Sequence, residues 1–338
     1  MNKPGQTPSP EKTFEAFRSY QKTAALKGAI ELDLFTAVDE GHDSVVSLAD
    51  HCRTSQRGIR ILCDFLVITE FLTKENDRYA LTPESAVFLS RRSPQYLGTA
   101  SQFLLSAQFT SFFSDVAGAV RAGGTVAVEQ GMVAEENPLW LQFAHGMSPV
   151  VAPAAEFIAQ LLDAGGGSTW KILDIAAGHG LFGITLAKQN PHATVVALDW
   201  SPVLSVAQEN AVKAGVADRY RLLPGSAFET DWDKGYDLIL ITNFFHHFDE
   251  ETCIGLMERI HEALAEKGRA VTLEFVPNED RITPPATAAF SLTMLVSTPS
   301  GDTYTFKQYE EMFQRAGFSR TDLHPIPQGT QQVLISHK

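Results

Sequence analysis

The sequence predicts an α/β protein in which a mostly helical N-terminal domain precedes a doubly wound, mostly parallel sheet of seven strands. Two patterns predict this architecture. From residue 170 onward, short apolar runs alternate with segments of helical periodicity, which is typical of a parallel sheet covered by helices. Before residue 95, apolar residues recur at helical spacing and one short hairpin follows them. A chain of 338 residues can bury two such cores.

The first segment, residues 1–95, has the pattern of a winged helix. Apolar residues at helical spacing predict helices over 11–20, 23–35, 44–51 and 56–68. Strand-forming residues on both sides of a polar turn at 75–77 then predict a hairpin. The last two helices follow residues that can cap them, namely Ser44 or Ser47 and Thr54 or Ser55.

Charge argues against nucleic acid as the partner of this winged helix. Residues 1–90 contain ten Lys or Arg against thirteen Asp or Glu, and the whole chain has a formal net charge of −13. A protein that binds DNA needs cations to displace counterions from phosphate. We therefore expect the segment to form a homodimer, with neither nucleic acid nor a membrane as partner. A ligand-sensing regulator remains an alternative.

The three cysteines are not arranged as pairs or as a zinc site, which favours free thiols in the cytoplasm. Residues 96–165 are predicted to form a helical connector, rich in aromatic residues and interrupted at 123–124 and 137–138. Residues 166–338 then form the predicted sheet domain.

A glycine turn lies at the start of that domain. The apolar run 171–175 predicts a buried strand, Gly178 and Gly180 follow it, and residues 181–188 have helical periodicity. A strand, a glycine turn and a helix together form a site for nucleotide-like ligands. Asp199, at the end of the next strand, lies 21 residues after Gly178 and can accept hydrogen bonds from both hydroxyls of a ribose.

Two cofactors compete for this turn. Residues 178–183 fit the dinucleotide pattern G-x-G-x-x-G, so an NAD-dependent oxidoreductase is one interpretation. Asp174 favours the other interpretation, because a carboxylate four residues before Gly178 repels a pyrophosphate but attracts a cationic amino group. The sequence therefore favours S-adenosylmethionine (SAM) over NAD.

Polar and aromatic residues also follow the later strands. Because ligands bind at the carboxyl ends of parallel strands, we expect these residues to lie at one edge of the sheet. Trp200 or Phe228 is placed to flank an adenine, and His246 and Glu274 are placed to face the methyl group of SAM. The predicted strands are 171–175, 194–198, 220–223, 237–242, 270–275, 320–326 and 331–336, and the helices between them are 181–188, 202–214, 251–265 and 306–316.

The motif Asp174-x-Ala176-x-Gly178-x-Gly180 resembles the first motif of class I SAM-dependent methyltransferases. With the winged helix before it, the chain resembles, from residue 14 to its end, the small-molecule O-methyltransferase family, whose plant members methylate phenolic hydroxyls. The resemblance implies a class I methyltransferase fold, SAM as cofactor, and a hydroxyl of a small aromatic or enolic metabolite as acceptor. Natural-product biosynthesis is the implied setting.

The resemblance also implies roles for individual residues. His246 matches the general base of the family, and Glu274 matches the acidic residue that orients it. The implied acceptor pocket contains Phe143, Met147, His247, Phe290 and Met294. The implied cofactor site contains Asp174, Ala176, Gly178, Gly180, Asp199, Trp200, Ser226, Ala227, Phe228 and Thr242.

The chain departs from the family at two places. Ser226 stands where the family has an aspartate, and Thr303 stands where it often has a second carboxylate, although Asp302 could replace that carboxylate. Methyl transfer to carbon or nitrogen is therefore the second enzymatic interpretation. His145, His246, His247 and Asp249 could together bind a metal, but their spacing does not favour such a site, so no metal is expected.

Overall fold

The computed structural model describes residues 8–327 and 329–338, without the side chains of 128–130. Its contacts divide the chain into two units, Met1–Leu105 and Ser106–Lys338. The helices of residues 106–165, part of the predicted connector, fall within the same unit as the sheet.

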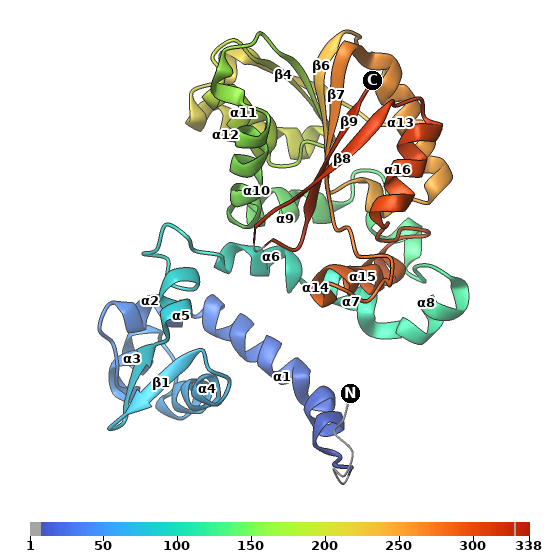
Figure 1. Cartoon of the computed structure of the whole chain (residues 1–338). Helices are drawn as coiled ribbons and strands as arrows, with labels where there is room; N and C mark the ends of the chain where they lie inside the picture. Colours follow the sequence, from blue (N-terminus) through green and yellow to red (C-terminus); the bar gives the residue numbers. More distant parts are fainter. Residues whose placement is uncertain (1–7, 328) are drawn as a thin grey trace. The chain divides into compact units, whose positions relative to one another are not determined.

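The N-terminal unit contains the predicted hairpin and the two helices predicted just before it (Figure 1). Ser44 and Ser55 are the residues that cap α3 and α4, each accepting a hydrogen bond from a backbone N–H three residues later. The unit consists of α1 (Glu11–Glu31), α2 (Leu34–Asp39), α3 (Val45–His51), α4 (Gln56–Ile68), β1 (Leu72–Glu75), β2 (Arg78–Leu81), α5 (Pro83–Phe88), the 3₁₀ turn η1 (Gly98–Ala100) and α6 (Ser101–Leu104).

The prediction of two helices over 11–20 and 23–35 was wrong. A single helix α1 continues through residues 21 and 22, because Gln21 and Lys22 are good helix formers and neither Gly nor Pro interrupts it there. The helix ends instead near Asp33, whose backbone is left-handed with φ of 53°. Leu34 and Phe35 consequently belong to α2 and lie in the core of the unit.

The first half of α1 is exposed on every side. Residues 11–24 contribute nothing to the buried core of the chain, and this part of the helix includes three aromatic rings. Phe14, Phe17 and Tyr20 are 54%, 68% and 67% exposed. An isolated helix of this length is marginal in water, so these turns need a partner surface.

In the described residues of the C-terminal unit, the sheet has seven strands in the order β5-β4-β3-β6-β7-β9-β8. The first five are parallel, and the last two are antiparallel to their neighbours, as predicted. The strands are β3 (Lys171–Ile175), β4 (Thr194–Asp199), β5 (Tyr220–Pro224), β6 (Tyr236–Thr242), β7 (Leu264–Glu274), β8 (Arg320–Pro325) and β9 (Gln332–His337). Strand β7 begins six residues earlier than predicted, with an irregular register opposite Tyr236.

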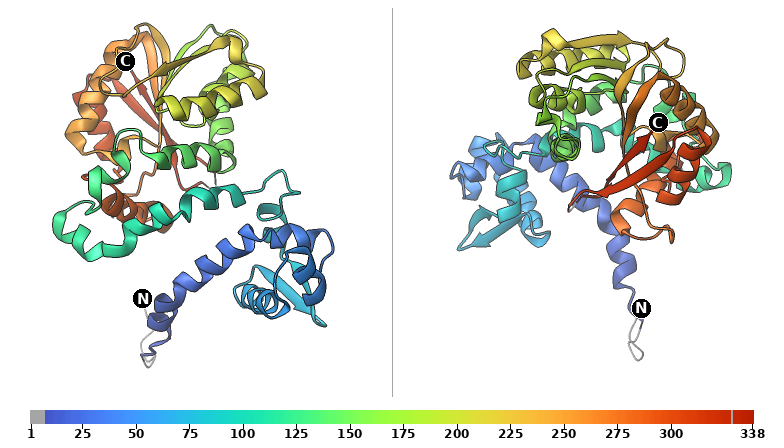
Figure 2. Two further views of the ribbon diagram at one scale, coloured as in Figure 1. Left: turned by 180° about the vertical axis from the view of Figure 1, so that it is seen from behind. Right: turned by 45° about the horizontal axis from the view of Figure 1, so that its top comes forward.

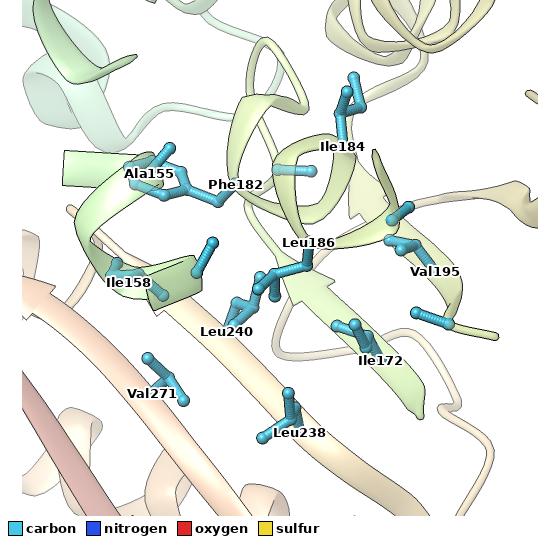
Figure 3. Packing of buried hydrophobic residues seen from close by; sticks show 14 of the residues in the cluster. Ala155, Ile158, Ile172, Phe182, Ile184, Leu186, Val195, Leu238, Leu240 and Val271 are labelled. Atoms are coloured by element: carbon cyan, nitrogen blue, oxygen red, sulfur yellow. The ribbon is translucent and has the colours of Figure 1, made fainter. Parts of the chain in front are cut away.

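Helices cover both faces of this sheet (Figures 1 and 2). One face packs against α10, α11 and α12, and the other packs against α13 and α16. Figure 3 shows Ile158 of α10 and Leu186 of α11 directed toward Leu240 in the sheet. The helices are α7 (Ala107–Ser111), α8 (Val116–Ala122), α9 (Pro138–Gly146), α10 (Ser148–Leu161), α11 (Leu181–Gln189), α12 (Ser201–Ala214), α13 (Glu250–Ala263), α14 (Pro285–Ala288), α15 (Phe290–Ser297) and α16 (Phe306–Arg315), with 3₁₀ turns η2 (Phe112–Asp115), η3 (Val128–Val133), η4 (Ala164–Gly166), η5 (Ala217–Arg219) and η6 (Phe245–His247).

The predicted breaks in the connector are confirmed. Gly123 ends α8 in the left-handed conformation, and Asn137 caps α9 by accepting a hydrogen bond from the Leu139 N–H. Among the described helices, none alone is long and apolar enough to cross a membrane, although the bent pair 98–104 and 107–122 meets that standard by length and composition.

Close packing of α11 on the sheet depends on Gly183. A Cβ at this position would lie 2.8 Å from Val195 Cγ1 and 2.9 Å from the Asp174 carboxylate. We expect Gly183→Ala to lower the free energy of unfolding by about 1–3 kcal/mol through overpacking. The matched control is Gly255→Ala in α13, where an added Cβ meets nothing within 4 Å. This substitution should stabilise the helix by about 0.5–1 kcal/mol, because alanine is a better helix former than glycine. Denaturant unfolding measures both, and equal effects would contradict the close approach of α11.

Candidate active site

The glycine turn between β3 and α11 has a left-handed backbone at three of its positions. Ala176, Gly178 and Gly180 have φ angles of 52°, 57° and 75°. A Cβ at Gly180 would lie 2.5 Å from Tyr220 Oη and 3.0 Å from Ala207 Cβ, so a larger residue does not fit. The turn therefore brings bare backbone to the carboxyl end of the sheet, where a ligand can approach it closely.

Asp199 joins the end of β4 to this turn. Its Oδ2 accepts a hydrogen bond from the Gly178 N–H at 2.8 Å, and its Oδ1 accepts one from the Trp200 N–H at 2.7 Å. Burial raises the pKa of Asp199 to about 6, although both backbone hydrogen bonds oppose that shift. The carboxylate keeps acceptor capacity on both oxygens, which is what the predicted contact to ribose hydroxyls requires.

Asp174, at the end of β3, is only half satisfied. Its Oδ2 accepts a hydrogen bond from the Gly183 N–H at 3.1 Å, but its buried Oδ1 has no hydrogen-bond partner in the described part of the chain. Burial raises the pKa of Asp174 to about 8, and the nearby Asp199 carboxylate contributes to that rise. A cationic ligand would stabilise the charged carboxylate, whereas a pyrophosphate would repel it. These residues therefore fit SAM.

His179, between the two glycines, was missed by the sequence analysis. Its Nδ1 accepts a hydrogen bond from the Leu181 N–H at 3.1 Å, and burial lowers its pKa to about 4. The Phe143 ring stacks on His179 with centroids 5.9 Å apart, and it lies 3.6 Å from the Cβ position of Gly178. Phe143, predicted for the acceptor pocket, therefore covers the glycine turn from α9.

His246 and Glu274 meet at the ends of β6 and β7. His246 Nδ1 lies 2.5 Å from Glu274 Oε2, and both side chains are almost completely buried. Glu274 Oε1 also accepts hydrogen bonds from the backbone N–H groups of Phe244 and Phe245, each at 2.9 Å. Because the carboxylate accepts at both oxygens, the hydrogen-bond network assigns the imidazole proton to Nδ1 and leaves a lone pair on Nε2.

Aromatic side chains surround His246. The Phe290 ring stands perpendicular to the imidazole at 5.1 Å and stacks on Phe275 at 4.0 Å. The His247 ring lies 4.2 Å from that of His246, and Trp140 contacts His247 edge-on at 5.2 Å. Burial lowers the pKa of His247 well below its usual range, and its Nδ1 donates to the Phe244 carbonyl at 3.1 Å.

The other residues predicted for the site differ in solvent exposure. Thr242 and Met294 are buried, Met147 and Trp200 are half-buried, and Phe228 is 37% exposed. The hydroxyl of Ser226, where the family has aspartate, accepts a hydrogen bond from the Phe228 N–H at 3.1 Å across Ala227. Phe228 stacks on Phe244, so the loop after β5 contacts the loop that contains His246.

Asp302 does not support His246 in this structure. Its carboxylate forms an exposed ion pair with Arg281 at 2.9 Å, while the buried Thr303 hydroxyl is hydrogen-bonded to Ser291. Of the four residues considered as metal ligands, His246 contacts Glu274 through Nδ1, and Asp249 caps α13 by accepting a hydrogen bond from the Thr252 N–H. The site is thus a single His–Glu pair beside an aromatic wall.

Comparison with known proteins confirms the predicted fold class. Residues 131–319 match the sequence profile of an O-methyltransferase domain, and residues 14–91 match that of an O-methyltransferase dimerisation domain. The chain is 26% identical over 307 residues to the 3-hydroxy-5-methyl-1-naphthoate 3-O-methyltransferase of Streptomyces sahachiroi, covering 88% of this chain and 86% of that protein.

Solved structures show the same architecture. A protein from Nostoc punctiforme PCC 73102, described as a candidate O-methyltransferase, is 50% identical with a TM-score of 0.95, covering 98% of this chain and 100% of that one. Human N-acetylserotonin methyltransferase, solved in complex with SAM, shares the fold with a TM-score of 0.85 at 20% identity, covering 100% of this chain and 99% of its own.

The half-satisfied Asp174 predicts a pH-dependent stability. Its pKa is higher folded than unfolded, so the cofactor-free protein binds more protons when folded and loses stability as pH rises from about 4 to about 8. Asp174→Asn removes this loss. At pH 8 we expect the variant to be more stable than wild type by about 1–3 kcal/mol, because the unpaired amide offsets part of the gain.

Denaturant unfolding of the cofactor-free protein at several pH values between 5 and 8 measures this difference. The exposed Asp231→Asn serves as the control and should show no such trend. A difference between Asp174→Asn and wild type that is the same at pH 5 and pH 8 would contradict the raised pKa.

Proposed function

The chain belongs to the O-methyltransferase family, and we propose that it moves the methyl group of SAM to a hydroxyl of a small aromatic or enolic molecule. We further propose that His246 is the general base. The observation that carries the proposal is the contact of His246 Nδ1 with Glu274 Oε2 at 2.5 Å. It fixes the tautomer in which Nε2 can accept a proton.

The cofactor would lie along the carboxyl ends of β3 and β4. Asp174 would face its cationic amino group, Asp199 would accept hydrogen bonds from the ribose, and the bare backbone at Gly178 and Gly180 would allow close approach. SAM supplies a methyl group activated by the positive sulfur to which it is bonded. The protein's task is to bring an acceptor oxygen in line with that bond.

His246 would make the acceptor more nucleophilic. The hydroxyl proton passes to Nε2 as the oxygen forms its bond to the methyl carbon and the sulfur–carbon bond breaks. The imidazolium that results lies against the Glu274 carboxylate, a charge-assisted hydrogen bond that stabilises it. Two backbone N–H groups hold that carboxylate, so it does not rotate away when the imidazole becomes charged.

The surroundings of His246 support a flat, apolar acceptor. Phe290, Phe275 and Trp140 present rings rather than polar groups, and aromatic rings bind other rings by edge and face contacts. The Streptomyces sahachiroi relative is named for a bicyclic hydroxynaphthoate, an acceptor of this shape. We propose a phenolic or enolic ring compound of a natural-product pathway as the substrate class.

Removal of the base tests the mechanism. Methyl-labelled SAM incubated with phenols, naphthols and cyclic enols identifies an acceptor. With that acceptor, His246→Ala should lower kcat by about 10²–10⁴, while the dissociation constant of SAM measured by calorimetry stays within about threefold of wild type. Glu274→Gln should have an effect of similar size, because its amide would donate to Nδ1 and move the ring proton to Nε2.

The exposed His145→Ala on α9 serves as the control and should leave turnover unchanged. Near-wild-type turnover of His246→Ala between pH 6 and 9 would overturn the role of the base. Transfer to a carbon or nitrogen acceptor that needs no base would then be the better explanation. Binding of NADH without binding of SAM would overturn the cofactor assignment.

The exposed rings of α1 support a homodimer. Residues 14–91 match a dimerisation domain. Phe17 is 68% exposed in the single chain, so its ring is available for a contact with a second copy. We expect light scattering to give twice the chain mass of 37.0 kDa. Phe17→Glu should shift the protein toward the monomer, because a charge buried at an interface is costly.

The control is Val212→Glu on α12, another helix-surface position, which should leave the dimer intact. A monomeric wild-type protein would contradict the proposal. Sequence-specific binding of the wild-type protein to DNA would instead support a regulator.

A further inference from the structure

A cluster of two histidines and one glutamate belongs to the N-terminal unit, whereas the residues proposed for methyl transfer belong to the C-terminal unit. Among the described residues, Glu40, His42 and His51 are the one group of at least three potential metal ligands whose ligand atoms all lie within 4.8 Å of one another. We propose that these three side chains form a surface site for a borderline divalent metal ion such as Zn²⁺.

The backbone holds two of the ligands in a defined turn. Glu40 and His42 flank Gly41, which has a φ of 93° and ends α2 in a Schellman motif. The Gly41 N–H donates to the Val38 carbonyl at 3.0 Å, and the His42 N–H donates to the Ala37 carbonyl at 3.0 Å. Glu40 and His42 are thus placed by hydrogen-bonded main chain.

The third ligand comes from a different helix. His51 is the last residue of α3, and its ring centroid lies 4.2 Å from that of His42, with the ring planes 38° apart. Neutral imidazole is the form of histidine that binds a metal. A bound ion would join the end of α2 to the end of α3.

The orientation of His42 matches that of a metal ligand. Its Nδ1 lies 2.7 Å from Ser47 Oγ. When Nδ1 carries the proton and donates to the hydroxyl, Nε2 keeps its lone pair. Ligating histidines commonly use one nitrogen for the metal and give the other N–H to a nearby oxygen. Ser47 therefore acts as the residue that would fix the tautomer and the ring orientation of His42.

The donor set selects the class of metal. Imidazole nitrogen suits zinc, copper and nickel, whereas magnesium and calcium prefer oxygen ligands throughout. Tetrahedral zinc with bonds of about 2.0–2.1 Å needs ligand atoms roughly 3.4 Å apart, so these side chains must close in slightly. Glu40 and His51 are exposed, and a water can complete the coordination.

Zinc binding to the full-length protein, purified without a histidine tag and stripped with a chelator, tests the proposal. Calorimetry with ZnCl₂ should give one equivalent per chain. His42→Ala and His51→Ala should each weaken binding by at least about tenfold, and Ser47→Ala by about tenfold through the loss of orientation. The exposed His192→Ala should bind zinc like wild type.

Two further measurements separate the site from a folding defect. Zinc should raise the melting temperature of wild type but not of His51→Ala, because a ligand that binds the native state stabilises it. Glu40→Gln preserves the size of the side chain and should also weaken zinc binding. Non-saturating binding, or equal binding by wild type, His42→Ala and His51→Ala, would overturn the proposal and leave an adventitious contact between two histidines.

Discussion

The buried carboxylate of Glu274 is the constraint on which the candidate active site depends. A charge that is removed from water must be hydrogen-bonded, and here three donors meet it: two backbone N–H groups from the turn after β6 and the imidazole of His246. These bonds determine where the chain runs after β6. The main chain turns sharply at Asn243, whose φ is 56°, and brings His246 over the end of β7. The position of the proposed base thus follows from the need to satisfy one acid.

The two other acids at this edge of the sheet, the half-buried Asp199 and the buried Asp174, differ in how far their oxygens are hydrogen-bonded. Asp199 accepts a backbone N–H at each oxygen, so the folded protein alone satisfies it. Asp174 keeps one oxygen without a partner among the described residues, and its pKa is raised further than that of Asp199. A buried carboxylate oxygen that has no hydrogen-bond donor within the described chain is suited to contact a cationic ligand. The incomplete Asp174 thus lies on the proposed cofactor side of the site, and the fully hydrogen-bonded Glu274 lies beside the proposed base.

The N-terminal unit has the helices and hairpin of a winged helix, but several of its basic side chains are paired with acids. Arg60 and Lys74 both pair with Asp64, and Arg78 pairs with Asp43, so acids neutralise three basic residues around α4 and the hairpin. The exposed turns of α1 present three aromatic rings, Phe14, Phe17 and Tyr20. The paired charges and the exposed rings together favour a surface that binds another protein rather than the phosphates of a nucleic acid.

The sequence alone determined the features that depend on neighbours in the chain. Alternating apolar runs predicted the strands and helices of the sheet domain, and the glycines predicted the turn after β3. The cap residues of two helices, Ser44 and Ser55, were among the candidates that the sequence offered. The pairing of His246 with Glu274 was also predictable, because both residues follow adjacent parallel strands. Local patterns settle such features, since strand ends of one sheet meet at one edge.

Only the tertiary structure decided contacts between residues that are distant in sequence and carry no pattern. The stacking of Phe143 on His179, the ion pair that draws Asp302 away to Arg281, and the meeting of His42 with His51 all depend on how loops and helix ends pack. The continuity of α1 was misjudged because helix propensity near residue 21 is uniform, and the left-handed Asp33 sets the actual end. Packing and backbone conformation, which periodicity does not encode, decide these positions.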